Sequence, residues 1–279
     1  MKRIQLFIII LLIIVSCSPK ITVGVTTNED PEIEVLKTSN IPIKEHSIQA
    51  VLWQQLSAEY KSLCYQSFNL AKIRLDHILL ENKSTKPLAI ITDIDETVLD
   101  NSPYSASLIE EGANYNSESW IAWGKLESAK AVPGAIDFFN YAANKPVEVF
   151  YISNRKDIQQ KETLANLEKL GLPFCDHNHL LLRTDTSSKK ERRNSILKTH
   201  DVVLIIGDNL GDFSDIFDHS STLRRNEMTD SLKTNFGKSF IMLPNPMYGS
   251  WEYGLYDENP NDWSEVEKDS IRRVKLKSY

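Results

Sequence analysis

The chain has 279 residues, of which 41% are hydrophobic and 25% are charged, and its formal net charge is −6. This composition is that of an ordinary globular protein large enough for a good core, and it excludes a disordered or fibrous protein. The acidic balance argues against a non-specific binder of nucleic acid polymers, because such a protein needs a basic surface to displace counterions. Any anionic ligand must therefore be held by a local site.

The first sixteen residues predict an export signal. Lys2 and Arg3 precede an uninterrupted apolar run over residues 6–15, which is too short to span a bilayer as a helix. The sequence Ile-Val-Ser-Cys that ends at Cys17 resembles the bacterial lipoprotein box, in which the cysteine is acylated and becomes the mature N-terminus. We interpret residues 1–16 as a lipoprotein signal peptide and Cys17 as the lipidation site, with an ordinary secretory peptide as the alternative. Several acyl chains would anchor the protein to a membrane.

The next two segments differ in their periodicity. Residues 17–46 mix Thr, Asn, Pro and acidic side chains without a sustained period, which is typical of a tether. In residues 47–80 apolar side chains recur every three or four positions, with no Gly or Pro. This pattern predicts one long amphipathic helix or two abutting ones.

Strands and helices alternate over the rest of the chain. Apolar runs predict buried strands over residues 88–95, 147–152, 202–206 and 240–243, with a short strand within 179–184. Helical patterns over residues 132–143, 156–170 and 187–197 separate these strands. This alternation is typical of parallel βαβ units and predicts the α/β class.

A polar segment over residues 101–130 contains several aromatic side chains and predicts helical turns beside a site. We expect residues 47–279 to form one domain, in which the segments around residues 47–80 and 101–130 make a small, mainly helical cap.

The first predicted strand ends in two carboxylates. Asp93 and Asp95 are spaced i, i+2, so a strand would point both to one side, at the edge where open α/β sheets bind ligands. Two neighbouring carboxylates repel each other, so the pair indicates a bound cation or a shared proton. A pair of this kind is weak evidence alone, because it also occurs in solvated turns.

Further polar side chains follow the later strands in the expected order. Ser153 ends the second strong strand, Asp208 and Asp212 follow the third, and Lys189 begins the helix between them. Each has a simpler alternative: Ser153 could cap a helix, Lys189 could be one charge on a solvated face, and the two aspartates resemble part of a calcium loop. Four such elements in this order are hard to obtain by chance.

Six segments carry a family pattern across nearly all of the chain after the signal: residues 93–104, 131–135, 150–156, 188–192, 207–213 and 240–252. With the lipoprotein box, they resemble the class C acid phosphatases, the bacterial lipoprotein 5'-nucleotidases of the haloacid dehalogenase (HAD) superfamily. The resemblance implies a Rossmann-like HAD core, with a central parallel sheet flanked by helices and a small helical cap. It also implies that Asp93 is the nucleophile, and that Asp95 is the acid that protonates the leaving group and then activates water.

The resemblance further implies a metal cofactor. The carboxylates of Asp93 and Asp208 and the backbone carbonyl of Asp95 would bind Mg²⁺, with Asp212 supporting the metal's water shell. Oxygen ligands without His or Cys favour magnesium over zinc.

The substrate's phosphoryl group would contact Lys189, Ser153 and Asn154. Lys190 is the neighbouring alternative to Lys189, and the spacing to Arg192 favours Lys189.

The substrate is predicted less directly. Tyr248 falls in the family's Pro-Asn-x-x-Tyr segment and, with Trp251 and Trp120, could stack on a nucleobase, although large aromatics also pack cores and interfaces. We expect a lipid-anchored enzyme of the bacterial envelope, with the outer membrane favoured, that hydrolyses nucleoside monophosphates for scavenging. The alternatives are a broad acid phosphatase for aryl and sugar phosphates and a non-catalytic binding lipoprotein. The sequence leaves open a disulfide between Cys64 and Cys175 and a homo-oligomer.

Overall fold

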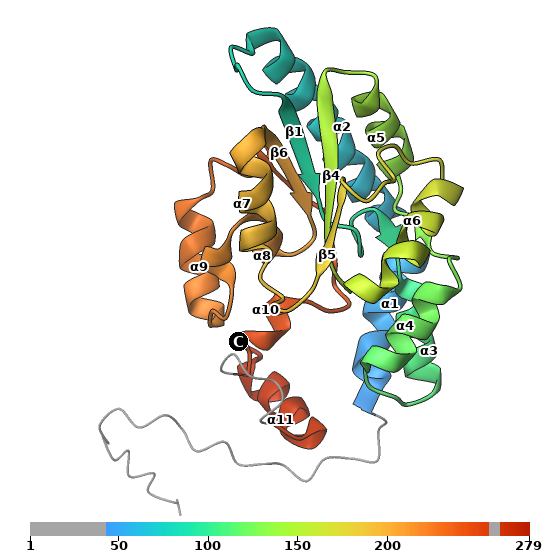
Figure 1. Ribbon diagram of the computed structural model, residues 1–279. Helices are drawn as coiled ribbons and strands as arrows, with labels where there is room; N and C mark the ends of the chain where they lie inside the picture. The colour runs from blue at the N-terminus through green and yellow to red at the C-terminus, as the bar shows by residue number, and fades with distance from the viewer. Residues whose placement is uncertain (1–42, 257–262) are drawn as a thin grey trace, which may run out of the picture. The chain divides into compact units, whose positions relative to one another are not determined.

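The structure is a computed structural model that describes residues 43–256 and 263–279 (Figure 1). All of these residues fall within one unit. The predicted signal peptide, the predicted lipidation site Cys17 and most of the predicted tether lie outside the described residues. Within the described part of the chain, no helix has the length and apolar character needed to cross a bilayer.

Five parallel strands form the central sheet, in the order β5-β4-β1-β6-β7 (Figure 1). Every residue of β1 is buried, because its neighbours pair with it on both sides and helices cover both faces. The predicted α/β class and parallel sheet are therefore confirmed. The strands are β1 (Leu88–Thr92), β4 (Val147–Lys156), β5 (Leu180–Arg183), β6 (Asp201–Gly207) and β7 (Phe240–Met242).

Helices cover the two faces of the sheet unequally. One face packs against α2 (Ala58–Glu81), α5 (Ala135–Ala143) and α6 (Gln160–Lys169), where the main core lies. The other face packs against α7 (Lys190–Thr199), whose Ile196 joins a smaller cluster with Ile91 of β1. Successive residues of a strand point to opposite faces, so burial on both sides explains why the strands are nearly continuous apolar runs.

The segment predicted as one long helix or two abutting ones is two helices, α1 (Ile48–Leu56) and α2. They are separated at Ser57, whose Oγ accepts a hydrogen bond from the Tyr60 N–H at 3.0 Å and so starts α2 as an N-cap. The prediction assigned both to the cap, but the stripe of buried side chains on α2 packs on the sheet. Only α1 lies with the cap, against α3.

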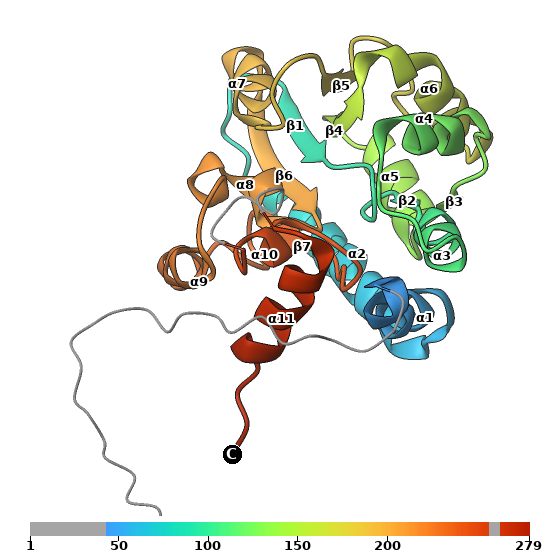
Figure 2. The same cartoon turned by 90° about the horizontal axis from the view of Figure 1, so that it is seen from below.

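The segment over residues 101–130 forms the expected helical elements. It contains α3 (Ser102–Glu110) and α4 (Ser117–Lys125), followed by β3 (Lys130–Ala131), which pairs antiparallel with β2 (Leu99–Asp100). Figure 2 shows α3 and α4 beside α1 and α6 respectively. An aromatic cluster of Tyr104, Tyr115 and Trp120 fills the space between these helices.

Several short elements complete the described chain, and the sequence analysis predicted none of them except η2, which falls within the helix expected over residues 156–170. One of the longest, α9, carries few apolar residues, so a hydrophobic period is a poor signal for it. They are α8 (Leu210–Phe213), α9 (Thr222–Ser231), α10 (Ser250–Tyr253), α11 (Glu265–Lys275) and the 3₁₀ turns η1 (Ile43–Ser47), η2 (Asp157–Gln159) and η3 (Asp215–Phe217). Cys64 is buried in α2 and Cys175 is partly buried, and both thiols are free.

Candidate active site

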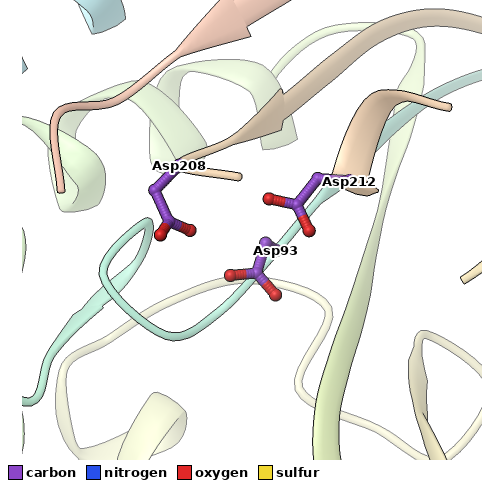
Figure 3. A group of neighbouring side chains, drawn as sticks. All are labelled: Asp93, Asp208 and Asp212. Atoms are coloured by element: carbon purple, nitrogen blue, oxygen red, sulfur yellow. The ribbon is translucent and has the colours of Figure 1, made fainter. Parts of the chain in front are cut away.

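Three carboxylates converge at the carboxyl end of the sheet. Asp93 follows β1, Asp208 follows β6, and Asp212 lies on α8 (Figure 3). One oxygen from each lies within 4.8 Å of the others, and among the described residues this is the one acidic, His or Cys cluster with such spacing. The Asp93 N–H donates to the carbonyl of Ile206 on β6 at 2.9 Å, which joins the ends of the two strands. The strands therefore set the distance between Asp93 and Asp208.

A buried ammonium group lies against this cluster. Lys189 Nζ donates to Oδ1 of Asp212 at 2.7 Å and also to Oδ1 of Asp93. Burial lowers the pKa of Lys189, but the two carboxylates more than compensate, so its pKa is raised overall. Lys190, by contrast, is exposed and pairs with Asp215 at 2.8 Å. The geometry thus supports the choice of Lys189 over Lys190.

The cluster carries more negative charge than Lys189 can balance. Withdrawal from water raises the pKa of Asp93 well above its usual range, Lys189 opposes this rise, and the other carboxylates add to it. Burial and Asp212 raise the pKa of Asp208 to about 7. Three carboxylates and one ammonium leave two negative charges when all are ionised (3 − 1 = 2). The cluster of oxygen donors therefore fits a divalent cation.

Asp208 is held by two donors. The hydroxyl of Thr97 donates to its Oδ1 at 3.1 Å, and the amide of Asn245 donates to its Oδ2 at 2.8 Å. Each oxygen accepts one hydrogen bond and keeps a lone pair for a cation.

Asp212 lies as near to the cluster as the predicted metal ligands do, although the sequence analysis gave it only a supporting role. Its Oδ1 accepts from Lys189, and its Oδ2 accepts from the Asn209 N–H at 2.9 Å. Gly207 is required here, because a Cβ at that position would overlap the Asp212 carboxylate. Each of its oxygens thus accepts one hydrogen bond, as each oxygen of Asp208 does, and the supporting role of Asp212 stays a prediction.

Asp95 does not share the environment of Asp93. β1 ends at Thr92, so both aspartates lie beyond the strand and its alternation does not apply to the pair. The Asp95 carboxylate instead accepts hydrogen bonds from Ser153 Oγ at 2.9 Å, Asn101 Nδ2 at 3.0 Å and the guanidinium of Arg155. The structure thus gives the two carboxylates different hydrogen-bond partners, although both line the same cavity.

Ser153 and Asn154 differ in exposure. Ser153 is fully buried, its hydroxyl donates to Asp95 and accepts from the Arg155 N–H, and it caps no helix. Its contact with the phosphoryl group stays a prediction. Asn154 is exposed, lines the cavity and accepts from Arg192 at 2.7 Å.

A cavity of about 500 Å³ opens over these groups. Asp93, Asp95 and Lys189 line it together with Trp120 and Tyr248. Trp251 lines a neighbouring hollow instead, so two of the three predicted stacking residues share the cavity with the carboxylates.

Tyr248 is tied to the loop that follows β1. Its side chain is 39% exposed, and its hydroxyl donates to the buried carboxylate of Glu96. Burial and the neighbouring Asp95 and Asp208 raise the pKa of Glu96. The backbone N–H of Asn101 donates a hydrogen bond to the Glu96 carboxylate at 2.8 Å. One edge of the Tyr248 ring is thus fixed, while part of it remains accessible.

A known protein family matches most of the chain. The model of the HAD superfamily, subfamily IIIB (acid phosphatase) matches residues 13–251. The chain belongs to this family. Acid phosphatase 1 of Solanum lycopersicum is 27% identical over 165 residues, which is 57% of each chain. Vegetative storage protein 2 of Arabidopsis thaliana is 24% identical over 206 residues, which is 70% of this chain and 66% of the relative.

Solved structures agree with the family assignment. The class C acid phosphatase from Bacillus anthracis is 43% identical, with a TM-score of 0.82, and the match covers 86% of this chain and all of that one. A second structure of that enzyme, described as having tungstate bound, gives the same TM-score at 42% identity. The predicted resemblance to class C acid phosphatases is therefore confirmed, although the chain spans only 57% of the length of the tomato relative.

Sequence reasoning missed several residues of this HAD site. Asp95 is held by Arg155 and Asn101. Asp208 is held by Thr97 and Asn245. Arg155 carried a usable signal, because it stands two residues after Ser153 on β4 and therefore points to the same side. The others are small polar side chains in turns, where residue type alone does not separate a site from a solvated loop.

Proposed function

We propose that the chain is a Mg²⁺-dependent phosphomonoesterase that acts through an aspartyl-phosphate at Asp93. One observation carries the proposal: a nucleophile candidate, a buried ammonium and two further carboxylates share one cavity at the carboxyl end of the sheet. Family membership supports the same reaction class. The tungstate bound in the relative's structure is a tetrahedral oxyanion of the same form as phosphate.

The first half of the proposed reaction transfers the phosphoryl group to the protein. An oxygen of Asp93 attacks phosphorus while the bond to the leaving oxygen breaks, and Asp95 gives its proton to that oxygen. In the second half, Asp95 takes a proton from water and the hydroxide attacks phosphorus. The bond between phosphorus and the Asp93 oxygen breaks, and inorganic phosphate is released. Lys189 stabilises charge on the phosphoryl oxygens, and the side chain of Asn154 orients the group.

Asp93, Asp208 and the backbone carbonyl of Asp95 would hold the magnesium ion, with Asp212 supporting it. When bound, the ion offsets the charge of the carboxylates and of the phosphate dianion, which would otherwise repel each other. The two negative charges left uncompensated by Lys189 support this assignment.

The direct test is hydrolysis of p-nitrophenyl phosphate by the purified domain. We expect activity to disappear with a chelator and to return with Mg²⁺. Asp93→Asn should abolish turnover while Mg²⁺ still raises the thermal midpoint, and Lys189→Ala should lose far more activity than Lys190→Ala. Full activity in excess chelator would refute the metal assignment, and no turnover of any phosphomonoester would favour the non-catalytic binding protein.

We further propose nucleoside monophosphates as the substrates. The cavity is larger than a phosphate group needs, and the rings of Trp120 and Tyr248 line it. The broad acid phosphatase remains the second candidate, because aromatic rings also accept aryl groups. A kcat/KM for a nucleoside monophosphate well above that for a sugar phosphate would support the nucleotide assignment, and equal values would support the broad enzyme.

The proposed location follows from the sequence alone. We propose that Cys17 is acylated and anchors the domain in the bacterial envelope, with the outer membrane favoured. Expression of the full chain and of Cys17→Ser in bacteria tests this. The unmodified chain should incorporate labelled fatty acid and sediment with membranes, and the variant should do neither. Incorporation that persists in the variant would refute the site.

A further inference from the structure

We propose that Arg155 is a positioning residue that holds Asp95 for proton transfer to the leaving group. This inference rests on the proposed function. The Nε and Nη2 atoms of Arg155 lie 2.9 and 2.8 Å from the same oxygen, Asp95 Oδ1. Arg155 is only 2% exposed. A buried guanidinium that donates from Nε to a carboxylate oxygen, with Nη2 close to the same oxygen, fixes the position of that carboxylate.

The contacts distinguish the two oxygens of Asp95. Oδ1 accepts two hydrogen bonds, one from Arg155 Nε and one from Asn101 Nδ2, and Arg155 Nη2 lies 2.8 Å away as an ion-pair contact. Oδ2 accepts one, from Ser153 Oγ. A carboxylate oxygen that already accepts two hydrogen bonds beside a guanidinium has no lone pair left for a proton. The geometry therefore assigns the transferred proton to Oδ2 and makes Oδ1 the anchored atom.

Arg155 is itself held from several sides. Its Nη2 donates to Asn101 Oδ1 at 3.2 Å, and its Nη1 donates to Thr163 Oγ1 on α6 at 3.4 Å. Its guanidinium also lies 5.5 Å from the ring of Trp120 on α4, which lines the cavity. Arg155 thus joins β4, α6 and α4 around Asp95. Lysine cannot replace it, because a single ammonium cannot make this planar set of contacts.

The proposed step is balanced within the reaction. As the bond between phosphorus and the leaving oxygen breaks, its electron pair goes to the leaving oxygen, which takes the proton from Asp95 Oδ2. Asp95 becomes a carboxylate and Arg155 remains charged throughout. A leaving alkoxide needs this proton, whereas p-nitrophenolate departs without one. A residue that positions the acid should therefore matter for alkyl phosphates and much less for p-nitrophenyl phosphate.

The experiment compares kcat/KM for glycerol phosphate and p-nitrophenyl phosphate, because kcat/KM reports the first, phosphoryl-transfer step. For Arg155→Lys we expect a loss of about 100-fold on glycerol phosphate and less than about fivefold on p-nitrophenyl phosphate, within the range of general acid catalysis. Asp95→Asn should show the same selectivity. In the Asp95→Asn background, Arg155→Lys should cause no further selective loss, since Arg155 acts through Asp95.

Asn166→Ala is the matched structural control. Asn166 is buried on α6, and its amide bonds only to the backbone of Ala129, away from Asp95. Its loss should leave the ratio between the two substrates unchanged. If Arg155→Lys does not fold, Thr163→Val, which removes only one support of Arg155, should give a smaller loss of the same selectivity.

The outcomes separate the two proposals. Equal losses on both substrates, or a full additive loss in the double variant, would overturn the positioning role. A wild-type protein that hydrolyses neither ester would instead refute the proposed function.

Discussion

At the scale of single residues, the site is organised by burial of charge. Asp93 and Lys189 are both buried and bonded to each other, while Asp208 retains a lone pair on each oxygen. Buried ionised groups persist only when they are paired or bind a metal. The chain therefore holds a set of charges that Lys189 alone does not balance and that a cation would complete.

We expect Asp208→Asn to weaken magnesium binding by at least about tenfold, because it removes a charged ligand from this set. The measurement is the rise in thermal midpoint with Mg²⁺ concentration, which reports binding without activity. Asp215→Asn serves as the control, because Asp215 pairs with the exposed Lys190 and the buried Arg193 and does not belong to the carboxylate cluster. Equal magnesium responses in both variants would contradict the role of Asp208.

Substitution of Tyr248 distinguishes stacking of its ring on a nucleobase from simple packing within the protein. We expect Tyr248→Ala to raise KM for a nucleoside monophosphate by about tenfold, in line with about 1–3 kcal/mol for a stacked base, and to change KM for a small phosphate little. Tyr248→Phe keeps the ring and loses only the hydroxyl bond to Glu96, so it should resemble the unmodified protein. Steady-state kinetics on both substrates check this, and equal effects of Ala on the two would count against stacking.

The alkylation rate of the Cys64 and Cys175 thiols should depend on pH. Burial raises the pKa of Cys64 to about 11 and that of Cys175 to about 12. The thiolate is the reactive form, so little of it exists at pH 8, and the alkylation rate of the folded domain should rise about tenfold per pH unit up to these values. Mass spectrometry after iodoacetamide treatment measures this. Rapid alkylation of both thiols at pH 8, or a disulfide, would contradict it.

At the scale of elements, the break between α1 and α2 decides which layer each helix joins. Continuous apolar spacing predicts a helix but not the direction in which it continues. Ser57 ends one helix and caps the next, which lets α1 lie against α3 while α2 packs on the sheet. The cap is therefore built partly from a segment that precedes the first strand.

We expect Ser57→Ala to lower the free energy of unfolding by about 1 kcal/mol, the usual value of an N-cap. Ser62→Ala is the control, because Ser62 lies within α2 and its exposed hydroxyl only donates back to Ala58. Urea unfolding of the two variants gives the comparison. A Ser57→Ala effect no larger than that of Ser62→Ala would show that the cap contributes little.

At the scale of the whole molecule, the described ends of the chain lie in contact. η1, at the start of the described residues, contacts α11 near the C-terminus, and both faces of β1 are covered by helices of the same unit. The described elements that position the site lie between residues 43 and 279.

We expect a protein of residues 43–279 to unfold in one cooperative transition and to keep the kcat/KM of the full-length chain. The physical reason is that the carboxylate cluster, the cavity and the sheet draw on residues within this range. Thermal unfolding and kinetics on the two proteins check it. A large loss of activity in the shorter chain would show that residues before 43 contribute to the site.

Local pattern was enough to predict the α/β class, the order of strands and helices, and the presence of Asp93, Asp208 and Lys189 at one edge. These follow from periodicity and from the rule that parallel strands end on the same side. The partners of Asp95, the position of α2 on the sheet and the burial of Ser153 against Asp95 required the folded chain. The reason is that such contacts join residues far apart in the chain, for example Asp95 and Arg155, which are 60 positions apart. Their geometry depends on how each turn leaves its strand, and the left-handed backbone of Glu96 in the turn after β1 has no sign in the hydrophobic pattern.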